Sequence, residues 1–370
     1  MRINKHEEAD HRFMDRASVR AIKRIGCAFL FLFLSLSVFS AIISVLFIDV
    51  GQGDAILIQT PDGKNILIDG GPVEAFPTLD DYLRSQGVEV LEIVIATHPH
   101  ADHIGGLSKI FAEYPVARVY MPRVSHTTVL YRNLLLAVRE AGLKIQTART
   151  DMDVTVEEGI LFRLLGPVRD DYEELNNHSV VIYLAFQEVY FLFMGDAETD
   201  AEADLMKRKL IPDADVLKVA HHGSRSSTSE AFLKKVEPTY AVISCGKNND
   251  YGHPHASVLK RLRLYASEVF RADRNGTLLF ETNGVALRIS DKDGWLVLPS
   301  SFPSESEGGL YIGNRKSKIF HLPSCAFLPD EKNRVYFSSV EEALNEGFRP
   351  CGLCRPLARE GKASGGNYPK

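Results

Sequence analysis

The sequence contains little cysteine and shows no excess of positive charge. Five cysteines are spread unevenly over 370 residues, which is too few to hold a secreted domain together as a disulfide framework. The formal net charge of -5 gives the chain no overall positive field that would attract nucleic acid. A polyanionic substrate would therefore have to be held locally, by metal ions or by a few lysine and arginine side chains.

A targeting segment is predicted at the N-terminus. Arg20, Lys23 and Arg24 precede an apolar run at residues 26–41, which is the order of features found in signal peptides. An uncleaved anchor that associates the protein with a membrane fits the same residues. We therefore assign residues 1–41 to a signal peptide or membrane anchor, and we expect the chain that follows to be secreted or otherwise extracytoplasmic.

Strand and helix patterns alternate through residues 42–290. Strands of branched apolar residues are predicted at residues 43–50, 55–60 and 65–71. Residues 92–97 form a continuous apolar strand of the kind that is buried on both faces. Helical segments between the strands would cover the outer faces of two sheets. We therefore predict an α/β fold for this domain, a four-layer αββα sandwich.

The composition changes after this domain. Residues 291–309 are rich in Ser, Pro and Gly, which is typical of a linker. Residues 310–357 form a second, compact segment. The polar residues 358–370 are predicted to be disordered.

Four potential metal ligands follow the apolar strand at residues 92–97. His98, His100, Asp102 and His103 offer imidazole and carboxylate groups, the usual ligands of zinc or manganese at hydrolytic sites. A solvated polar loop has no need of three imidazoles, so we expect this loop to bind metal. His98 and His100 would serve one ion, and Asp102 and His103 a second.

Other strand ends supply further candidate ligands. Asp196 closes an apolar strand, where an unpaired carboxylate is costly; it could bridge two cations or cap the next helix. His222 ends another strand and is a candidate ligand, whereas His221 is expected to face away from the ion. His178 would complete the ligand set of the first ion, unless it is a surface histidine and Asn177 takes its place.

Polar loops beside these ligands indicate a substrate pocket. His253 and His255 would line it as catalytic residues, with His255 donating to the leaving group or binding an oxyanion; helix capping is their alternative role. Phosphate oxygens could be held by a set of polar residues, or these could form an ordinary loop. The set comprises Ser224, Arg225, Ser226 and His221.

Two divalent ions, zinc or manganese, would suit a hydrolytic reaction at such a site. Held about 3.5–4 Å apart, they lower the pKa of a bridging water and stabilise both the attacking and the leaving oxygen. The nucleophile would then be hydroxide, and Asp102 would act as a catalytic residue that orients it.

The motifs together resemble the metallo-β-lactamase superfamily, and within it the ComEC-type competence hydrolases. Six segments occur in the order of that branch: FIDVGQGDAILIQTPDGKNILIDGG, THPHADHIGG, NNHSVV, FLFMGDAE, LKVAHHGS and YGHPHASVL. The resemblance covers about residues 45–289. It implies the metallo-β-lactamase sandwich fold and a phosphodiesterase that degrades one strand of DNA during uptake, with Asp54 reaching the site.

No multi-span membrane channel accompanies these motifs, so we expect a stand-alone hydrolase with extracellular or incoming DNA as its substrate. Two alternatives remain open. The same fold could act on a small ester, a thioester or a β-lactam, or the protein could be a non-catalytic accessory of DNA uptake.

The C-terminal segment carries a second metal motif. One histidine and three cysteines, His321, Cys325, Cys351 and Cys354, have the spacing of a closed structural zinc site. A fold this short generally needs such a staple. The segment resembles the metal-binding module of the Ada DNA-repair protein, in which the first ligand is a cysteine and not a histidine. A disulfide between Cys351 and Cys354 is the alternative, and the basic residues of the segment modestly favour DNA binding.

Overall fold

The computed structural model describes residues 41–266, 268–297, 311–321, 328–329, 331–337 and 340–351. Except for residue 41, the predicted targeting segment lies outside these ranges, as do most of the predicted linker and all of the predicted tail. Within the described ranges, no helix combines the length and the apolar character needed to cross a membrane.

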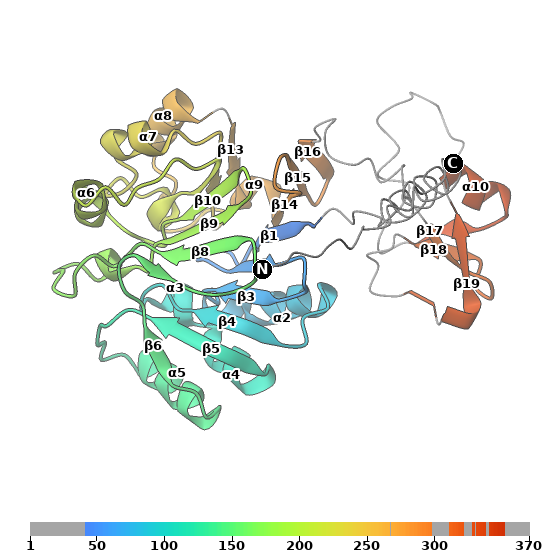
Figure 1. The fold of residues 1–370 in the computed structure, drawn as a ribbon, viewed down its shortest axis with the longest axis horizontal. Coiled ribbons are helices and arrows are strands. Elements are labelled where there is room, and N and C mark those ends of the chain that lie inside the picture. Colours follow the sequence, from blue (N-terminus) through green and yellow to red (C-terminus); the bar gives the residue numbers. More distant parts are fainter. Residues whose placement is uncertain are drawn as a thin grey trace, which may run out of the picture. The chain divides into compact units, whose positions relative to one another are not determined.

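A nine-stranded sheet forms the first half of the α/β domain (Figure 1). Its order is β16-β15-β14-β1-β2-β3-β4-β5-β6, and β3 to β6 run parallel. The strands are β1 (Ile43–Phe47), β2 (Ile56–Gln59), β3 (Asn65–Ile68), β4 (Leu91–Ile95), β5 (Val116–Met121), β6 (Ile145–Thr147), β14 (Leu278–Thr282), β15 (Leu287–Asp291) and β16 (Gly294–Val297).

A seven-stranded sheet forms the second half. Its order is β13-β12-β11-β10-β9-β8-β7, and β10 to β13 run parallel. The strands are β7 (Met152–Asp153), β8 (Ile160–Leu164), β9 (Ile182–Phe186), β10 (Val189–Phe193), β11 (Val216–Lys218), β12 (Tyr240–Ile243) and β13 (Glu268–Arg271).

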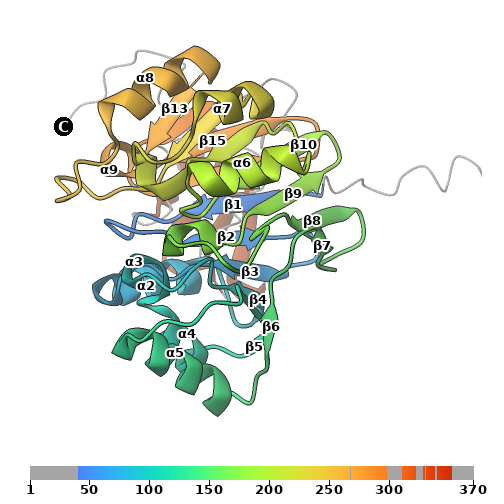
Figure 2. The same ribbon diagram turned by 90° about the vertical axis from the view of Figure 1, so that its left-hand side faces the viewer.

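Helices cover the outer face of each sheet (Figure 2). The first sheet carries α2 (Phe76–Ser85), α4 (Leu107–Glu113) and α5 (Val129–Glu140), and the second carries α6 (Thr199–Lys207), α7 (Glu230–Val236) and α8 (Ala256–Tyr265). Short elements near the predicted metal ligands are η1 (Val73–Ala75), α3 (Ala101–Ile104), η2 (Leu175–His178), η3 (Ala220–Gly223) and α9 (Ala272–Asn275). The layers confirm the αββα sandwich that the sequence predicts.

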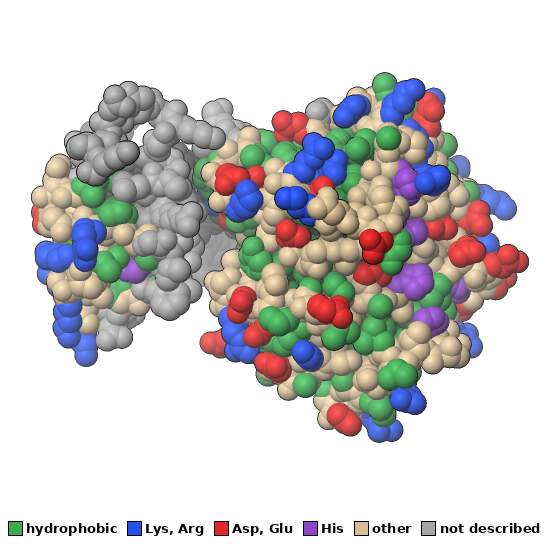
Figure 3. Space-filling view, turned by 180° about the vertical axis from the view of Figure 1, so that it is seen from behind, with side chains coloured by type: hydrophobic (Ala, Val, Ile, Leu, Met, Phe, Trp, Pro, Cys, Tyr) green, Lys and Arg blue, Asp and Glu red, His purple; other side chains and the backbone are tan. Residues whose placement is uncertain are grey.

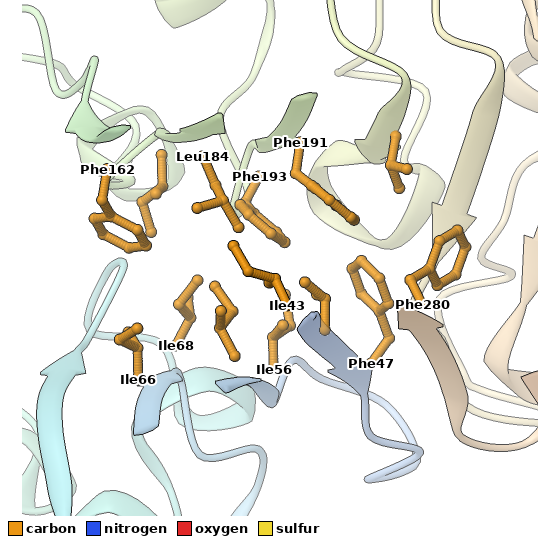
Figure 4. Packing of buried hydrophobic residues seen from close by; sticks show 14 of the residues in the cluster. Ile43, Phe47, Ile56, Ile66, Ile68, Phe162, Leu184, Phe191, Phe193 and Phe280 are labelled. Atoms are coloured by element: carbon orange, nitrogen blue, oxygen red, sulfur yellow. The ribbon is translucent and has the colours of Figure 1, made fainter. Parts of the chain in front are cut away.

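The core between the two sheets explains why the strands are almost continuously apolar. In β1, Val45 and Phe47 point into the space between the sheets, whereas Leu46 points to the helices outside. Both sides of the strand are therefore buried. The Phe47 ring lies 5.3 Å from that of Phe280 on the neighbouring strand β14 and 6.1 Å from that of Phe193 in the other sheet, so the contact with Phe193 joins the two sheets (Figure 4).

The C-terminal segment contains a small sheet with its own core. The strand order is β19-β17-β18-β20, with α10 packed on it. Its elements are β17 (Tyr311–Asn314), β18 (Ile319–His321), η5 (Glu331–Asn333), β19 (Arg334–Phe337), α10 (Val340–Asn345) and β20 (Arg349–Pro350). Parallel pairing of β18 with β20 places His321 beside Cys351, and both are buried. The other two predicted zinc ligands, Cys325 and Cys354, lie outside the described residues.

Candidate metal centre

The histidine loop follows β4 at the edge where the parallel strands β3, β4 and β5 end. His98 and His100 precede α3, whereas Asp102 and His103 lie in its single turn. The turn is close to the backbone of neighbouring segments: a Cβ atom on Gly105 would lie 2.3 Å from the Val73 nitrogen. Glycine is therefore needed there for the loop to pack against the end of β3.

Asp196 lies at the centre of the site. Its Oδ2 atom is 3.2 Å from Nε2 of His103, 3.4 Å from Nε2 of His222 and 3.8 Å from Nε2 of His98. The fold thus brings together residues that follow β4, β10 and β11. Histidines gather in one patch on the face of the domain shown in Figure 3.

These side chains form groups with the spacing of metal ligands. In the described part of the chain, His98, His103 and Asp196 form one such group, and Asp102, His103 and His222 form another. In the second group, Oδ2 of Asp102 lies 3.2 Å from Nε2 of His222 and 4.0 Å from Nε2 of His103. His103 belongs to both groups, whereas the sequence assigned it to one ion.

The donor atoms of these groups fit metal ions. Three donor atoms are buried and have no hydrogen-bond partner among the described residues: Nε2 of His103, Nε2 of His222 and Oδ1 of Asp196. Buried polar atoms are costly without a partner, and neutral imidazole and carboxylate together suit zinc or manganese. The residues present can therefore hold the ions that the sequence predicts.

The opposite ring nitrogens are held by other groups. Nδ1 of His103 lies 2.8 Å from Oδ2 of Asp69, which also accepts a hydrogen bond from the Thr97 hydroxyl. Nδ1 of His222 donates to the carbonyl oxygen of Ser244 at 2.9 Å. These contacts favour the tautomer with a free Nε2, the arrangement found in many metal sites. Asp69 was missed by the sequence analysis.

A buried ion pair lies next to His222. Nζ of Lys218 lies 2.6 Å from Oδ2 of Asp54, and both side chains are almost fully closed to solvent. Oδ1 of Asp54 lies 3.4 Å from Nδ1 of His222. Asp54 reaches the site as expected, whereas Lys218 was given no role by the sequence.

Neighbouring charges shift the pKa values of several site residues in the direction opposite to the effect of burial. Burial raises the pKa of Asp196, but the imidazoles of His103 and His222 outweigh it and hold this pKa well below its ordinary value. Burial lowers the pKa of both histidines, but Asp196 and other carboxylates raise it well above the usual range. His98 differs, because burial and the nearby charge of His103 lower its pKa. In the metal-free protein, protons on His103 and His222 therefore balance the buried carboxylates.

His100 contacts the site through His98. Its Nδ1 atom lies 2.9 Å from Nε2 of His98, so these two nitrogens face the same small space. His100 is half-buried and lies toward the opening of the site. It belongs to none of the closely spaced ligand groups found among the described residues.

The ligand role of His178 stays a prediction, since its Nδ1 atom is buried and has no hydrogen-bond partner among the described residues. Its Nε2 atom faces the carbonyl oxygen of Tyr172 at 3.0 Å, and His178 belongs to none of the ligand groups in the described residues. The reason is local: residues 175–178 form the turn η2 and β9 begins only at Ile182. Asn177, the alternative, accepts hydrogen bonds from the backbone of Glu198 and Ala201 at the start of α6.

His221 lies differently from the expectation. The strand β11 ends at Lys218, and both His221 and His222 adopt a left-handed backbone with φ of 48° and 52°. Such backbone is strained for non-glycine residues and is often found at functional sites. His221 thereby turns toward the centre, with Nε2 3.9 Å from Oδ2 of Asp196. Its Nδ1 atom lies 3.0 Å from Oε1 of Glu198, a partner that the sequence did not indicate.

The predicted substrate residues border the histidines. Nη2 of Arg225 lies 2.8 Å from Nε2 of His255, so His255 holds the arginine in place. The Ser226 hydroxyl donates to Glu198 and lies 2.9 Å from that of Ser224. The His253 ring lies 5.4 Å from that of His221.

His253 is neutral at physiological pH. Burial, followed by the charges of His221 and His222, lowers the pKa of His253 to about 4. It can accept or donate a hydrogen bond at the rim, but it does not carry a proton for release as an imidazolium at neutral pH.

Comparisons with known proteins identify the family. Residues 48–247 match the metallo-beta-lactamase superfamily, and residues 303–356 match the metal binding domain of Ada. The chain therefore belongs to the metallo-beta-lactamase superfamily, and both resemblances seen in the sequence are confirmed.

Named relatives include competence proteins. ComE operon protein 3 of Bacillus subtilis is 32% identical over 273 residues, which are 69% of this chain and 35% of that protein. Recombination protein 2 of Haemophilus influenzae is 36% identical over 228 residues, 60% of this chain and 26% of that protein. Competence protein ComA of Neisseria gonorrhoeae is 29% identical over 236 residues, 63% of this chain and 31% of that protein. The chain thus spans about a third of these relatives or less.

Proposed function

We propose that this metallo-hydrolase is a phosphodiesterase that cleaves extracellular or incoming DNA. One observation carries the proposal: the buried carboxylate of Asp196 faces the unpartnered Nε2 atoms of His103 and His222. A carboxylate at this position can be shared by two ions, and two-ion sites are common in enzymes that cleave phosphodiesters. The competence and recombination proteins among its relatives favour DNA as the substrate.

Six residues would hold the ions. When bound, the ions would supply an activated hydroxide and stabilise the attacking and the leaving oxygen. The residues are His98, His100, Asp102, His103, Asp196 and His222.

The two carboxylates have different tasks in this proposal. The Asp196 side chain is 2% exposed, so it belongs to the interior of the centre, whereas that of Asp102 is 29% exposed and faces the opening. Burial opposes ionisation of Asp102, but His222, whose Nε2 atom lies 3.2 Å from Oδ2 of Asp102, and the charge of His103 lower the pKa of Asp102 below its ordinary value. Asp102 is thus an ionised acceptor that can orient a water toward the substrate.

Arg225 would bind a substrate oxygen. Its guanidinium is exposed and is held by His255, so it can approach a phosphate without a large loss of side-chain entropy. His255 then acts as a positioning residue, because both of its ring nitrogens face Arg225 in this structure.

A nuclease assay tests the proposal. The purified protein is incubated with labelled single- and double-stranded DNA and with Mn²⁺ or Zn²⁺. We expect cleavage by the wild type, loss of cleavage in Asp196→Asn, and retention in the matched control Asp213→Asn, whose side chain is exposed. Parallel assays use a chromogenic β-lactam and a thioester. Hydrolysis of either without any cleavage of DNA would replace the proposal by the corresponding alternative.

We also propose that the protein acts outside the cytoplasm. The basis is the basic and apolar pattern of residues 20–41. Fractionation of cells that express the full chain should recover it in the medium, the periplasm or the membrane. Recovery in the cytosol would contradict this location.

A further inference from the structure

A cavity whose walls carry three arginines lies at the sheet edge that also holds the histidine loop. The cavity has a volume of about 570 Å³. We call it the arginine pocket; it is lined by Arg123, Arg149 and Arg169, together with Thr147, Thr150 and Asp170. None of the arginines is among the residues that the sequence analysis selected.

The arginine pocket lies at the same sheet edge as the histidine loop. Arg123 follows the end of β5 by two residues, and Arg149 follows the end of β6 by two residues. The strands β4, β5 and β6 are parallel neighbours (Figure 2), so the residues that directly follow them lie at one edge of the sheet. Adjacent strands are about 4.8 Å apart, which puts the start of the Arg149 loop roughly 10 Å from the start of the histidine loop.

The loop after β5 connects the two sites. It begins at Arg123 in the wall of the arginine pocket and continues to His126. The His126 ring lies 6.4 Å from that of His100. A chain-like ligand at the metal centre can therefore continue along this loop into the pocket.

The three arginines are engaged to different degrees. Arg169 already forms two ion pairs, with Nε 2.9 Å from Asp204 and Nη1 2.9 Å from Asp171. These pairs hold its side chain in place at the wall of the pocket. Arg123 has only a long, exposed pair with Asp170 at 3.8 Å, which contributes little. Arg149 is exposed and has no ion pair or hydrogen bond in the described part of the chain. Its guanidinium is available to an anion.

We infer that the arginine pocket binds a backbone phosphate of the nucleic-acid strand whose neighbouring phosphodiester lies at the metal centre. The inference rests on the proposed function. Exposed arginine guanidinium groups are the chemistry that binds phosphate oxygens. The chain has no overall positive charge, so a local site of this kind is what holds a polyanion. A neutral ester would have no anionic group to place there.

Binding of single-stranded DNA tests the inference separately from cleavage. Fluorescence anisotropy of a labelled phosphorothioate oligonucleotide, which resists hydrolysis, is followed with the metal-loaded full chain over a range of salt concentrations. The variants are Arg149→Ala and Arg123→Ala/Arg149→Ala. The matched control is Arg139→Ala, which removes an equal charge at the C-terminal end of α5, away from this sheet edge.

We expect the Kd to rise several-fold in Arg149→Ala and to rise further in the double variant. The slope of log K against log salt should fall by about 0.7 for each phosphate contact removed. Arg139→Ala should keep the slope of the wild type. The inference that the pocket binds a phosphate would be overturned by equal affinities and slopes for Arg149→Ala and Arg139→Ala, or by no binding by the wild type.

The nuclease assay tests the proposed function, and the binding assay tests the arginine pocket. Cleavage by a wild type whose binding ignores Arg149 would keep the phosphodiesterase and reject the pocket. Arg149-dependent binding without cleavage under any metal would keep the pocket and reject the enzyme.

Discussion

Lys218 and Asp54 form an ion pair that is closed to solvent, although they lie 164 positions apart in the chain. The pair joins β11 of the second sheet to the loop between β1 and β2. Oδ1 of Asp54 also lies 3.4 Å from Nδ1 of His222. Burial raises the pKa of Asp54, but Lys218 and then His222 outweigh it and lower this pKa to about 2. Asp54 is therefore an ion at neutral pH, and Lys218 is its main counter-charge.

Removal of one partner should destabilise the protein strongly. In Lys218→Met the carboxylate of Asp54 stays buried without its cation, and such a loss costs about 3–5 kcal/mol. The free energy of unfolding in urea measures the effect. The matched control is Lys235→Met, because Lys235 forms an exposed pair with Asp213 at 3.8 Å and its loss should cost under about 1 kcal/mol.

The double variant Lys218→Met/Asp54→Asn separates charge from packing. It removes both charges and leaves groups of similar size, so most of the lost stability should return. If the double variant is as unstable as the single one, the ion pair is not the cause.

Asp69 should control metal affinity without touching the ion. It accepts from Nδ1 of His103 at 2.8 Å and from the backbone nitrogen of Thr97 at 2.8 Å, so it fixes the orientation of the imidazole. In Asp69→Asn the amide holds the ring less firmly, and affinity should fall about 10–100-fold. Competition with a chelating dye measures it. Asp62→Asn, an exposed position, is the control, and an equal affinity in Asp69→Asn would contradict the role.

The main ligands could be predicted from the sequence because they follow apolar strands. A strand that is buried on both faces can place polar groups only at its ends, so the histidine loop, Asp196 and His222 were recognisable. Their convergence on one site follows from the sandwich, in which parallel strands end at a common edge.

The supporting residues could not be predicted in the same way. Lys218 is the last residue of β11 and resembles a surface residue in an alternating pattern, and only its partner Asp54 on the other sheet's side shows that it is buried. Asp69 stands before two glycines and resembles a turn residue. His178 lies in the turn η2, whose place is set by the contact of Asn177 with the start of α6, and the sequence does not show that contact.

Metal binding to the hydrolase domain should release protons. Carboxylates, chiefly Asp196, raise the pKa of His103 and His222 in the metal-free protein against the opposing effect of burial, so both rings are protonated at neutral pH. An ion at Nε2 must displace these protons, and affinity should weaken as the pH falls, by roughly tenfold per pH unit for each proton released.

Calorimetry with Mn²⁺ tests this release. The ion favours nitrogen and oxygen ligands over thiolates, so the C-terminal cysteines contribute little to the heat. Titrations at one pH in two buffers with different heats of ionisation should give different enthalpies. Identical enthalpies would show that no proton leaves and that the histidines are neutral before binding.

The C-terminal module should lose its zinc when His321 is removed. Pairing of β18 with β20 places His321 beside Cys351, where both can face one ion. His321→Ala should lower the zinc content by one equivalent and destabilise the module, because three ligands do not close a structural site. His321→Cys, which restores the ligand type of the Ada module, should keep the zinc. Elemental analysis after dialysis measures both, with Lys316→Ala, an exposed position of the same module, as the control. Full zinc content in His321→Ala would exclude this ligand set, and a Cys351 that resists thiol reagents until reduction would favour the disulfide instead.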